Sequence, residues 1–85
     1  MTYFVYLARC ADNSIYTGYC KDIVARERKH NQGDGAKYTR QRRPITVVYS
    51  EKYRTLSAAL KRELALKKLT KLKKEDLIRS VKHSQ

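Results

Sequence analysis

The amino-acid sequence predicts one α+β domain, in which a three-stranded, mostly antiparallel sheet is flanked by helices in the order β-β-α-β-α-α. The chain has 85 residues, which suffice for one hydrophobic core and leave no room for a second domain. Short runs of β-branched and aromatic residues alternate with segments of strong helix formers. Because 41% of the residues are hydrophobic and only one is proline, we expect residues 1–85 to be ordered nearly throughout.

Residues 3–9 and 15–18 are predicted to form a β-hairpin. Both runs are rich in aromatic and β-branched residues, and residues 11–14 between them have the composition of a turn. Cys10 and Cys20 would then end the two strands roughly 15 Å apart along the ladder. A disulfide requires Cα atoms within about 7 Å, so we expect both cysteines to be packing residues.

A helix is predicted for residues 23–31, and a basic segment follows it. Asp22 is a good N-cap for this helix, and the glycines within residues 32–35 allow the positive φ with which helices often end. Residues 36–43 are strongly basic, and we expect them to form a loop or a single helical turn.

The second half of the chain is predicted to hold one strand and two helices. Pro44 ends the basic segment, and residues 45–49 have the composition of a strand. Thr55 can cap a long helix over residues 56–69, since leucine, alanine, lysine, arginine and glutamate all favour helix. A last helix is expected over about residues 73–81.

The charge of the chain indicates a polyanionic partner. Lysine and arginine outnumber the acids by 20 to 8, which gives a formal net charge of +12. Such a field attracts nucleic acid, so we expect DNA as the partner and leave RNA open. A basic surface without a partner is the alternative, and no segment has the long apolar face that membrane binding requires. The N-terminus resembles no signal peptide, so we expect a cytoplasmic protein, with the nucleoid as one location.

The helix over residues 56–69 places one carboxylate among apolar side chains. At about 100° per residue, five apolar residues share one stripe, namely Leu56, Ala59, Leu60, Leu64 and Leu66. Glu63 falls near the centre of this stripe and is predicted to point toward the core. Burying an ionised carboxylate is costly unless a cation compensates, which makes Glu63 a candidate metal ligand. The alternative is a partly buried ion pair with Lys67, four residues further on.

Four other residues are candidates for the same site. Arg26 and His30 lie four residues apart and share one face of their helix, which an ordinary solvated face would also show. Tyr6 and Tyr16 share a face of the sheet only if the hairpin loop has an odd number of residues. The other enzyme classes that we considered lack support: Gly33 and Gly35 do not belong to a phosphate-binding loop motif, and no residue would orient a Cys-His nucleophile pair.

Together these spacings resemble the GIY-YIG nuclease superfamily, which includes homing endonucleases, some restriction enzymes and the nuclease module of bacterial excision repair. The signature triplets correspond to Phe4-Val5-Tyr6 and Tyr16-Thr17-Gly18. The arginine, the histidine and the later glutamate of the family match Arg26, His30 and Glu63. Phe4 replaces the first glycine, Thr17 replaces the isoleucine, and Tyr19 stands where repair-type members carry lysine. The length and the lysine-rich end resemble the small stand-alone bacterial members.

This resemblance implies a DNA endonuclease that uses one divalent metal, Mg²⁺ or Mn²⁺, and no small-molecule cofactor. It gives Tyr6 the role of general base, with a pKa lowered by metal and arginine charge, and Tyr16 that of positioning water or phosphate. Arg26 would clamp the scissile phosphate, His30 would steady the phosphate or the base, and Glu63 would hold the metal. A domain of this size has little surface for reading bases, so we expect selection by DNA structure more than by sequence, as in DNA repair.

The basic segment is predicted to grip the nucleic-acid backbone. Five residues are candidates for this contact: Lys37, Tyr38, Arg40, Arg42 and Arg43. Tyr38 could also stack on an unpaired base, whereas an ordinary basic loop with a packed tyrosine is the alternative. A non-catalytic DNA- or RNA-binding module remains the rival interpretation for the whole chain.

Overall fold

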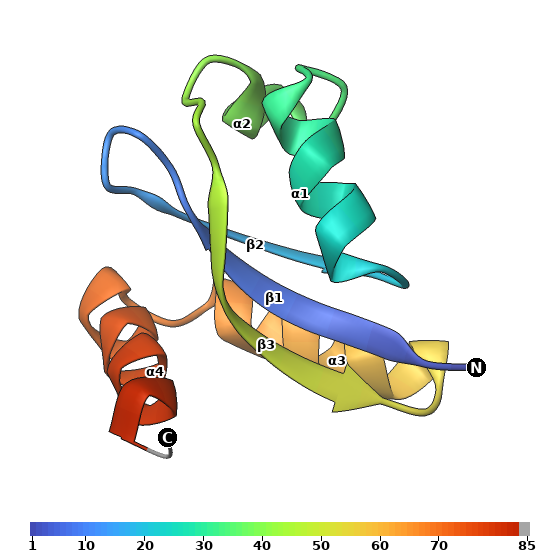
Figure 1. The fold of residues 1–85 in the computed structure, drawn as a ribbon. Helices are drawn as coiled ribbons and strands as arrows, with labels where there is room; N and C mark the ends of the chain where they lie inside the picture. Colours follow the sequence, from blue (N-terminus) through green and yellow to red (C-terminus); the bar gives the residue numbers. More distant parts are fainter. Residues whose placement is uncertain (84–85) are drawn as a thin grey trace.

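The computed structural model describes residues 1–83 and confirms the predicted α+β fold (Figure 1). In chain order, the elements are β1 (Tyr3–Arg9), β2 (Ile15–Cys20), α1 (Ile23–Asn31), α2 (Lys37–Arg40), β3 (Thr46–Tyr53), α3 (Leu56–Lys67) and α4 (Lys71–His83). The four-residue α2 is the single helical turn expected within the basic segment. Strand β3 is longer than predicted at its C-terminal end, and α4 extends beyond both predicted ends.

The three strands form one antiparallel sheet in the order β2-β1-β3, so β1 is central. In the hairpin Arg9 pairs with Ile15, which leaves five residues, 10–14, in the loop. This odd number puts Tyr6, which pairs with Gly18, and Tyr16, which pairs with Ala8, on the same face of the sheet.

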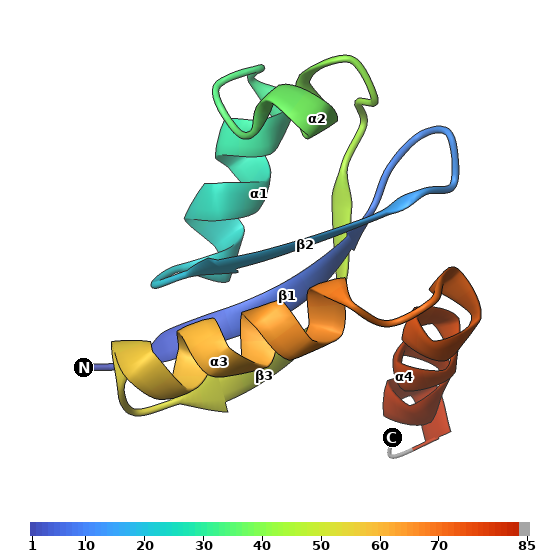
Figure 2. The same ribbon diagram turned by 180° about the vertical axis from the view of Figure 1, so that it is seen from behind.

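Helices cover both faces of the sheet. Figures 1 and 2 show α1 and α2 on one side of the strands and α3 on the other, with α4 beyond the end of α3. The core is divided in the same way: Val5 and Leu7 pack with Ala59 and Leu66 of α3. On the other face, a second cluster contains Tyr6, Ala8, Cys10, Cys20 and Ile45. Both cysteines are free and buried, as expected for packing residues.

Local sequence determines where α1 and α3 begin. The carboxylate of Asp22 accepts a hydrogen bond from the backbone N–H of Ala25, at 3.0 Å. The hydroxyl of Thr55 accepts one from the N–H of Ala58, at 3.1 Å. Each bond satisfies one of the backbone donors that a helix leaves free in its first turn, so both predicted caps are confirmed.

The orientation of α3 differs from the prediction. Leu56, Leu60 and Leu64 are 40%, 39% and 57% exposed, although their stripe was predicted to face the core. The buried face of α3 is instead centred on Ala59 and Leu66, because Arg62 of this face binds an acid on the sheet. Glu63 lies at the border of the buried face, and its side chain is 15% exposed.

Two ion pairs fix the C-terminal helices to the sheet. Arg62 of α3 donates to both carboxylate oxygens of Glu51 on β3, at 2.8 and 3.0 Å, and the hydroxyls of Tyr49 and Tyr53 donate to the same carboxylate. Arg9 at the end of β1 donates to both oxygens of Glu75 on α4, at 2.8 and 2.7 Å. Paired, planar contacts of this kind fix direction as well as distance.

Candidate active site

The two signature tyrosines meet on the α1 face of the sheet. Their ring centroids are 6.3 Å apart, and Tyr6 is only 1% exposed. Gly18, which pairs directly with Tyr6, makes this possible: a Cβ atom there would lie 2.6 Å from the Tyr6 hydroxyl and 3.0 Å from the ring of Tyr16. The glycine of the second triplet is therefore needed for close approach and not for an unusual backbone angle.

His30 is buried against both tyrosines, and its hydrogen bonds define its tautomer. Thr39 donates its hydroxyl proton to the carbonyl oxygen of Ala36, at 2.9 Å, so its oxygen can only accept from the His30 Nδ1–H, at 2.8 Å. In neutral His30 the other nitrogen, Nε2, then accepts from the Tyr6 hydroxyl at 2.8 Å. Burial, followed by the charge of Arg26, lowers the pKa of His30 and favours this neutral form.

The segment between α1 and α2 closes over His30. A Cβ atom on Gly35 would lie 2.1 Å from Nδ1 of His30, so only glycine fits beside the ring without moving it. Gly33 has a φ of 89° and ends α1 as predicted, whereas Gly35 serves close packing. Thr39, which is fully buried, was not identified from the sequence, because nothing in a basic segment marks one hydroxyl as inward-facing.

Tyr16 lies between His30 and Tyr38 in a series of ring contacts. Its ring lies edge-on to His30, with centroids 5.4 Å apart, and is stacked on Tyr38 at 6.1 Å. The guanidinium group of Arg42 lies over the ring of Tyr38, 3.9 Å from its centroid. Tyr38 is nevertheless 41% exposed, so its stacking on an unpaired base stays a prediction.

Arg26 extends from α1 toward the tyrosines. Its charge acts to lower the pKa of Tyr6, but burial and the neighbouring Tyr16 outweigh it and raise that pKa well above the usual value. The charge of Arg26 thus acts in the expected direction but does not by itself bring the pKa of Tyr6 below its usual value, and the contribution of a metal stays a prediction. In this arrangement the ring of Tyr6 is buried and its hydroxyl donates its proton to His30.

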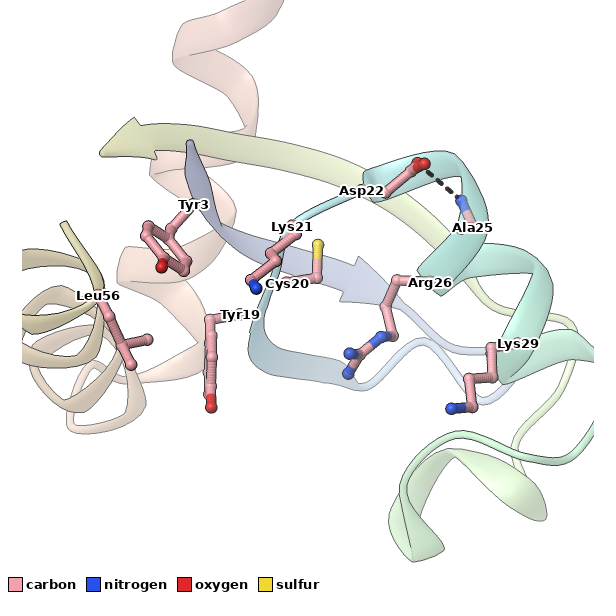
Figure 3. Close-up of a pocket in the computed structure, with 9 residues that line it drawn as sticks. All are labelled: Tyr3, Tyr19, Cys20, Lys21, Asp22, Ala25, Arg26, Lys29 and Leu56. Carbon is pink, nitrogen blue, oxygen red and sulfur yellow. Dashed lines mark hydrogen bonds between the residues drawn. The ribbon is translucent and has the colours of Figure 1, made fainter. Parts of the chain in front are cut away.

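A hollow of about 460 Å³ lies beside Arg26 at the edge of β2. Figure 3 shows Arg26 and Lys29 of α1 on one side of it and Tyr19 and Leu56 on the other. Lys21 adds a further positive charge, while the carboxylate of Asp22 is engaged in capping α1. This hollow has the charge and the size to receive a phosphate group.

Glu63 lies on α3, which covers the opposite face of the sheet from the tyrosines and His30. Other residues of α3 nevertheless meet that face at the β2 edge: Leu56 lines the hollow with Arg26, and Lys67 lines a second hollow with Tyr16. Glu63 lies between them along the helix, with one contact to Lys67 at 3.6 Å. The structure thus gathers four predicted residues on one face and places the fifth on the helix that borders their edge strand.

The residues at this edge fit a single divalent metal. No group of three or more His, Cys, Asp or Glu residues in the described part of the chain could hold a metal without help. Mg²⁺, however, is commonly held by one or two carboxylates, several waters and the phosphates of a substrate. Glu63, largely buried and without a close hydrogen-bond partner among residues 1–83, has the oxygen donors that such an ion prefers.

Only some of the side chains that were predicted to contact the nucleic-acid backbone are free of hydrogen bonds within residues 1–83. Arg42 bonds the carbonyl oxygen of Tyr38 and the carboxylate of Asp12, and Arg43 bonds the carbonyl oxygens of Arg40 and Asn31. These two arginines hold the segment together. Lys37 and Arg40, by contrast, are exposed on α2 beside the tyrosines.

This fold and this arrangement of residues are those of a known class of domain, which the comparisons identify. The model of the GIY-YIG catalytic domain matches residues 2–76, and the chain therefore belongs to the GIY-YIG family. The chain is 55% identical over 78 residues to a UPF0213 protein of Staphylococcus aureus, an alignment that covers 92% of this chain and 95% of that protein.

Two solved structures resemble the chain. A UPF0213 protein from Bacillus halodurans, solved by solution NMR, has a TM-score of 0.59 and 40% identity, covering 93% of this chain and 84% of the other. A protein from E. faecalis has a TM-score of 0.64 and 38% identity, covering 100% and 90%. Among residues 1–83, no helix is long and apolar enough to span a membrane.

Proposed function

We propose that this chain is a metal-dependent nuclease that hydrolyses phosphodiester bonds in DNA with little dependence on sequence. The observation that supports this function is the gathering of Tyr6, Tyr16, Arg26 and His30 on one face of the sheet, with Glu63 on the helix that borders the edge strand β2. The family membership and the net charge of +12 agree with a nucleic-acid substrate.

The residues of the site have different roles in the proposed reaction. Arg26 binds the scissile phosphate through its planar guanidinium group, which matches two phosphate oxygens. Tyr16, the site tyrosine whose ring reaches the surface, orients the attacking water and is available for proton transfer. Tyr6 and neutral His30, which are hydrogen-bonded to each other, pack against the ring of Tyr16 and fix its position.

In the reaction, the oxygen of water bonds to phosphorus, and the bond to the leaving sugar oxygen breaks. The water loses one proton, and the leaving oxygen gains one. A Mg²⁺ or Mn²⁺ ion held by Glu63 would supply positive charge for the phosphoryl group and lower the pKa of bound water. Arg26 opposes the additional negative charge that develops on the phosphoryl oxygens.

Cleavage of branched, nicked and linear DNA, with and without Mg²⁺ or Mn²⁺, tests the proposal. Glu63→Gln and Arg26→Gln should each reduce kcat by about 10²–10³-fold. Asp76→Asn and Arg28→Gln, at exposed sites on α4 and α1, are matched controls that should cut normally. Metal-independent DNA binding without cleavage on any substrate would contradict a nuclease and favour a binding module.

A further inference from the structure

A second hollow, of about 300 Å³, lies at the other end of the β2 edge. Six residues line it: Ile15, Tyr16, Thr17, Tyr38, Lys67 and Lys74. They come from β2, α2, α3 and α4, and α4 lies on the side of the molecule that carries the hairpin loop (Figures 1 and 2). Tyr16 belongs both to this hollow and to the candidate active site.

The charge of this hollow is positive and poorly compensated. Lys67 and Lys74 extend from different helices, and none of the lining residues is acidic. Burial, followed by the charge of Lys67, lowers the pKa of Lys74, in agreement with the place of both lysines in one hollow. No carboxylate within residues 1–83 forms an ion pair with Lys74, and the Glu63 contact of Lys67 is 3.6 Å long. Two like charges held together in this way are stabilised by an anion between them.

The surroundings indicate which anion this is. Aromatic rings of Tyr16 and Tyr38 form one wall, and the buried hydroxyl of Thr17 has no hydrogen-bond partner in the described part of the chain. Between the two hollows β2 runs from Tyr16 to Cys20, a length of about 13 Å. One DNA strand presents a phosphate about every 3.4 Å along the duplex axis, so one stretch of backbone reaches both hollows.

We propose that Lys67 and Lys74 form a binding site for a second DNA phosphate, a few nucleotides from the phosphate that is cut. This subsite rests on the proposed nuclease function and gives it a substrate path along the edge of β2. It also explains how α4 contributes to the site, because the ion pair between Arg9 and Glu75 fixes the turn of α4 that carries Lys74.

Binding of a short duplex DNA without divalent metal, measured over a range of salt concentrations, tests this subsite. Lys74→Gln should weaken binding and reduce the slope of log K against log salt by about 1, the effect of one lost phosphate contact. Lys52→Gln removes the same charge from an exposed position on β3, the opposite edge of the sheet, and should leave the slope unchanged. Amide NMR spectra of both variants confirm that they fold.

The outcomes separate the subsite from the nuclease. If Lys74→Gln behaves like Lys52→Gln, the subsite is wrong, whether or not the protein cuts DNA. If the slope falls as expected but no DNA is cut with metal, the subsite stands and the nuclease proposal fails. Inorganic phosphate is a second probe: it should shift the NMR signals of Tyr16 and Thr17, and a titration that shifts neither would overturn the site.

Discussion

At the scale of single residues, the site depends on a buried chain of hydrogen bonds. Tyr6 donates to His30, His30 donates to Thr39, and Thr39 donates to the carbonyl oxygen of Ala36. Each donor has one acceptor, so the chain has one direction and the imidazole one tautomer. Thr39 thereby acts as a positioning residue, because it holds the ring against which Tyr16 packs.

Replacing Thr39 tests this chain of hydrogen bonds. Thr39→Val keeps the shape of the side chain but leaves the Nδ1–H of His30 without its acceptor, at a cost of about 1–3 kcal/mol in unfolding free energy. Thr39→Ser keeps the hydroxyl and should be close to the parent. In a His83→Gln background, ¹⁵N NMR of the remaining histidine should report a proton on Nδ1 for the parent and Ser variant. A proton on Nε2 in the parent would contradict the assigned direction.

The buried imidazole also predicts a pH dependence of stability. Burial and Arg26 lower the pKa of folded His30 below its ordinary value of 6.5, so below that pH the unfolded chain binds more protons than the folded one. The stability that neutral His30 contributes is complete above pH 6.5 and is lost as the pH falls through the lowered folded pKa. Urea unfolding over this range measures it, and the His30→Gln variant should lack this part of the pH dependence.

At the scale of elements, the rotation of α3 decides which of its residues reach the site edge. Periodicity alone predicted a buried leucine stripe, but α3 turns so that Arg62 reaches Glu51 on β3. The leucines at positions 56, 60 and 64 are exposed as a result, and Glu63 remains largely buried at the border. The helical propensity of α3 could be predicted from local sequence. Its rotation about its own axis depends on the bond between Arg62 and Glu51, which lie 11 residues apart in the sequence.

Glu51→Gln should therefore affect both stability and cleavage. The loss of the charge weakens the two bonds from Arg62 and those from Tyr49 and Tyr53, and we expect a cost of about 1–3 kcal/mol in unfolding free energy. A helix free to turn would also hold Glu63 less well, so the metal concentration for half-maximal cleavage should rise. Asp76→Asn, which removes an exposed carboxylate, is the control. Unchanged metal dependence in Glu51→Gln would contradict the link between this pair and Glu63.

At the scale of the whole molecule, cationic side chains gather along the β2 edge of the sheet and on α2. Two of the lysines at the β2 edge have partners, since Lys67 contacts Glu63 and Lys21 lies over the ring of Tyr3. Among residues 1–83, five other cationic residues at this edge or on α2 form neither an ion pair nor a cation–π contact: Arg26, Lys29, Lys37, Arg40 and Lys74. Arg42 and Arg43 are engaged with backbone carbonyl oxygens, so they stabilise the shape of the segment that was predicted to grip DNA.

Five phosphate contacts predict a steep dependence of binding on salt. With about 0.9 ions released per contact on duplex DNA, log K should fall against log salt with a slope of about −4.5. Measurement without divalent metal, on duplexes of unrelated sequence, should give the same slope for each. A slope near zero, or affinities that differ strongly between sequences, would contradict binding through the backbone.

The sequence by itself determined the order of the elements, the caps at Asp22 and Thr55, and the spacing of the candidate residues. These depend on interactions within a few residues, which local composition predicts. Only the tertiary structure decided that Tyr6 and Tyr16 share a face, because this depends on a hairpin loop of five residues. It also decided that Tyr6 is buried, that Thr39 faces His30 and that α3 is rotated toward Glu51. Each of these results from contacts between segments that are distant in the chain, and their geometry is fixed only when the whole core packs.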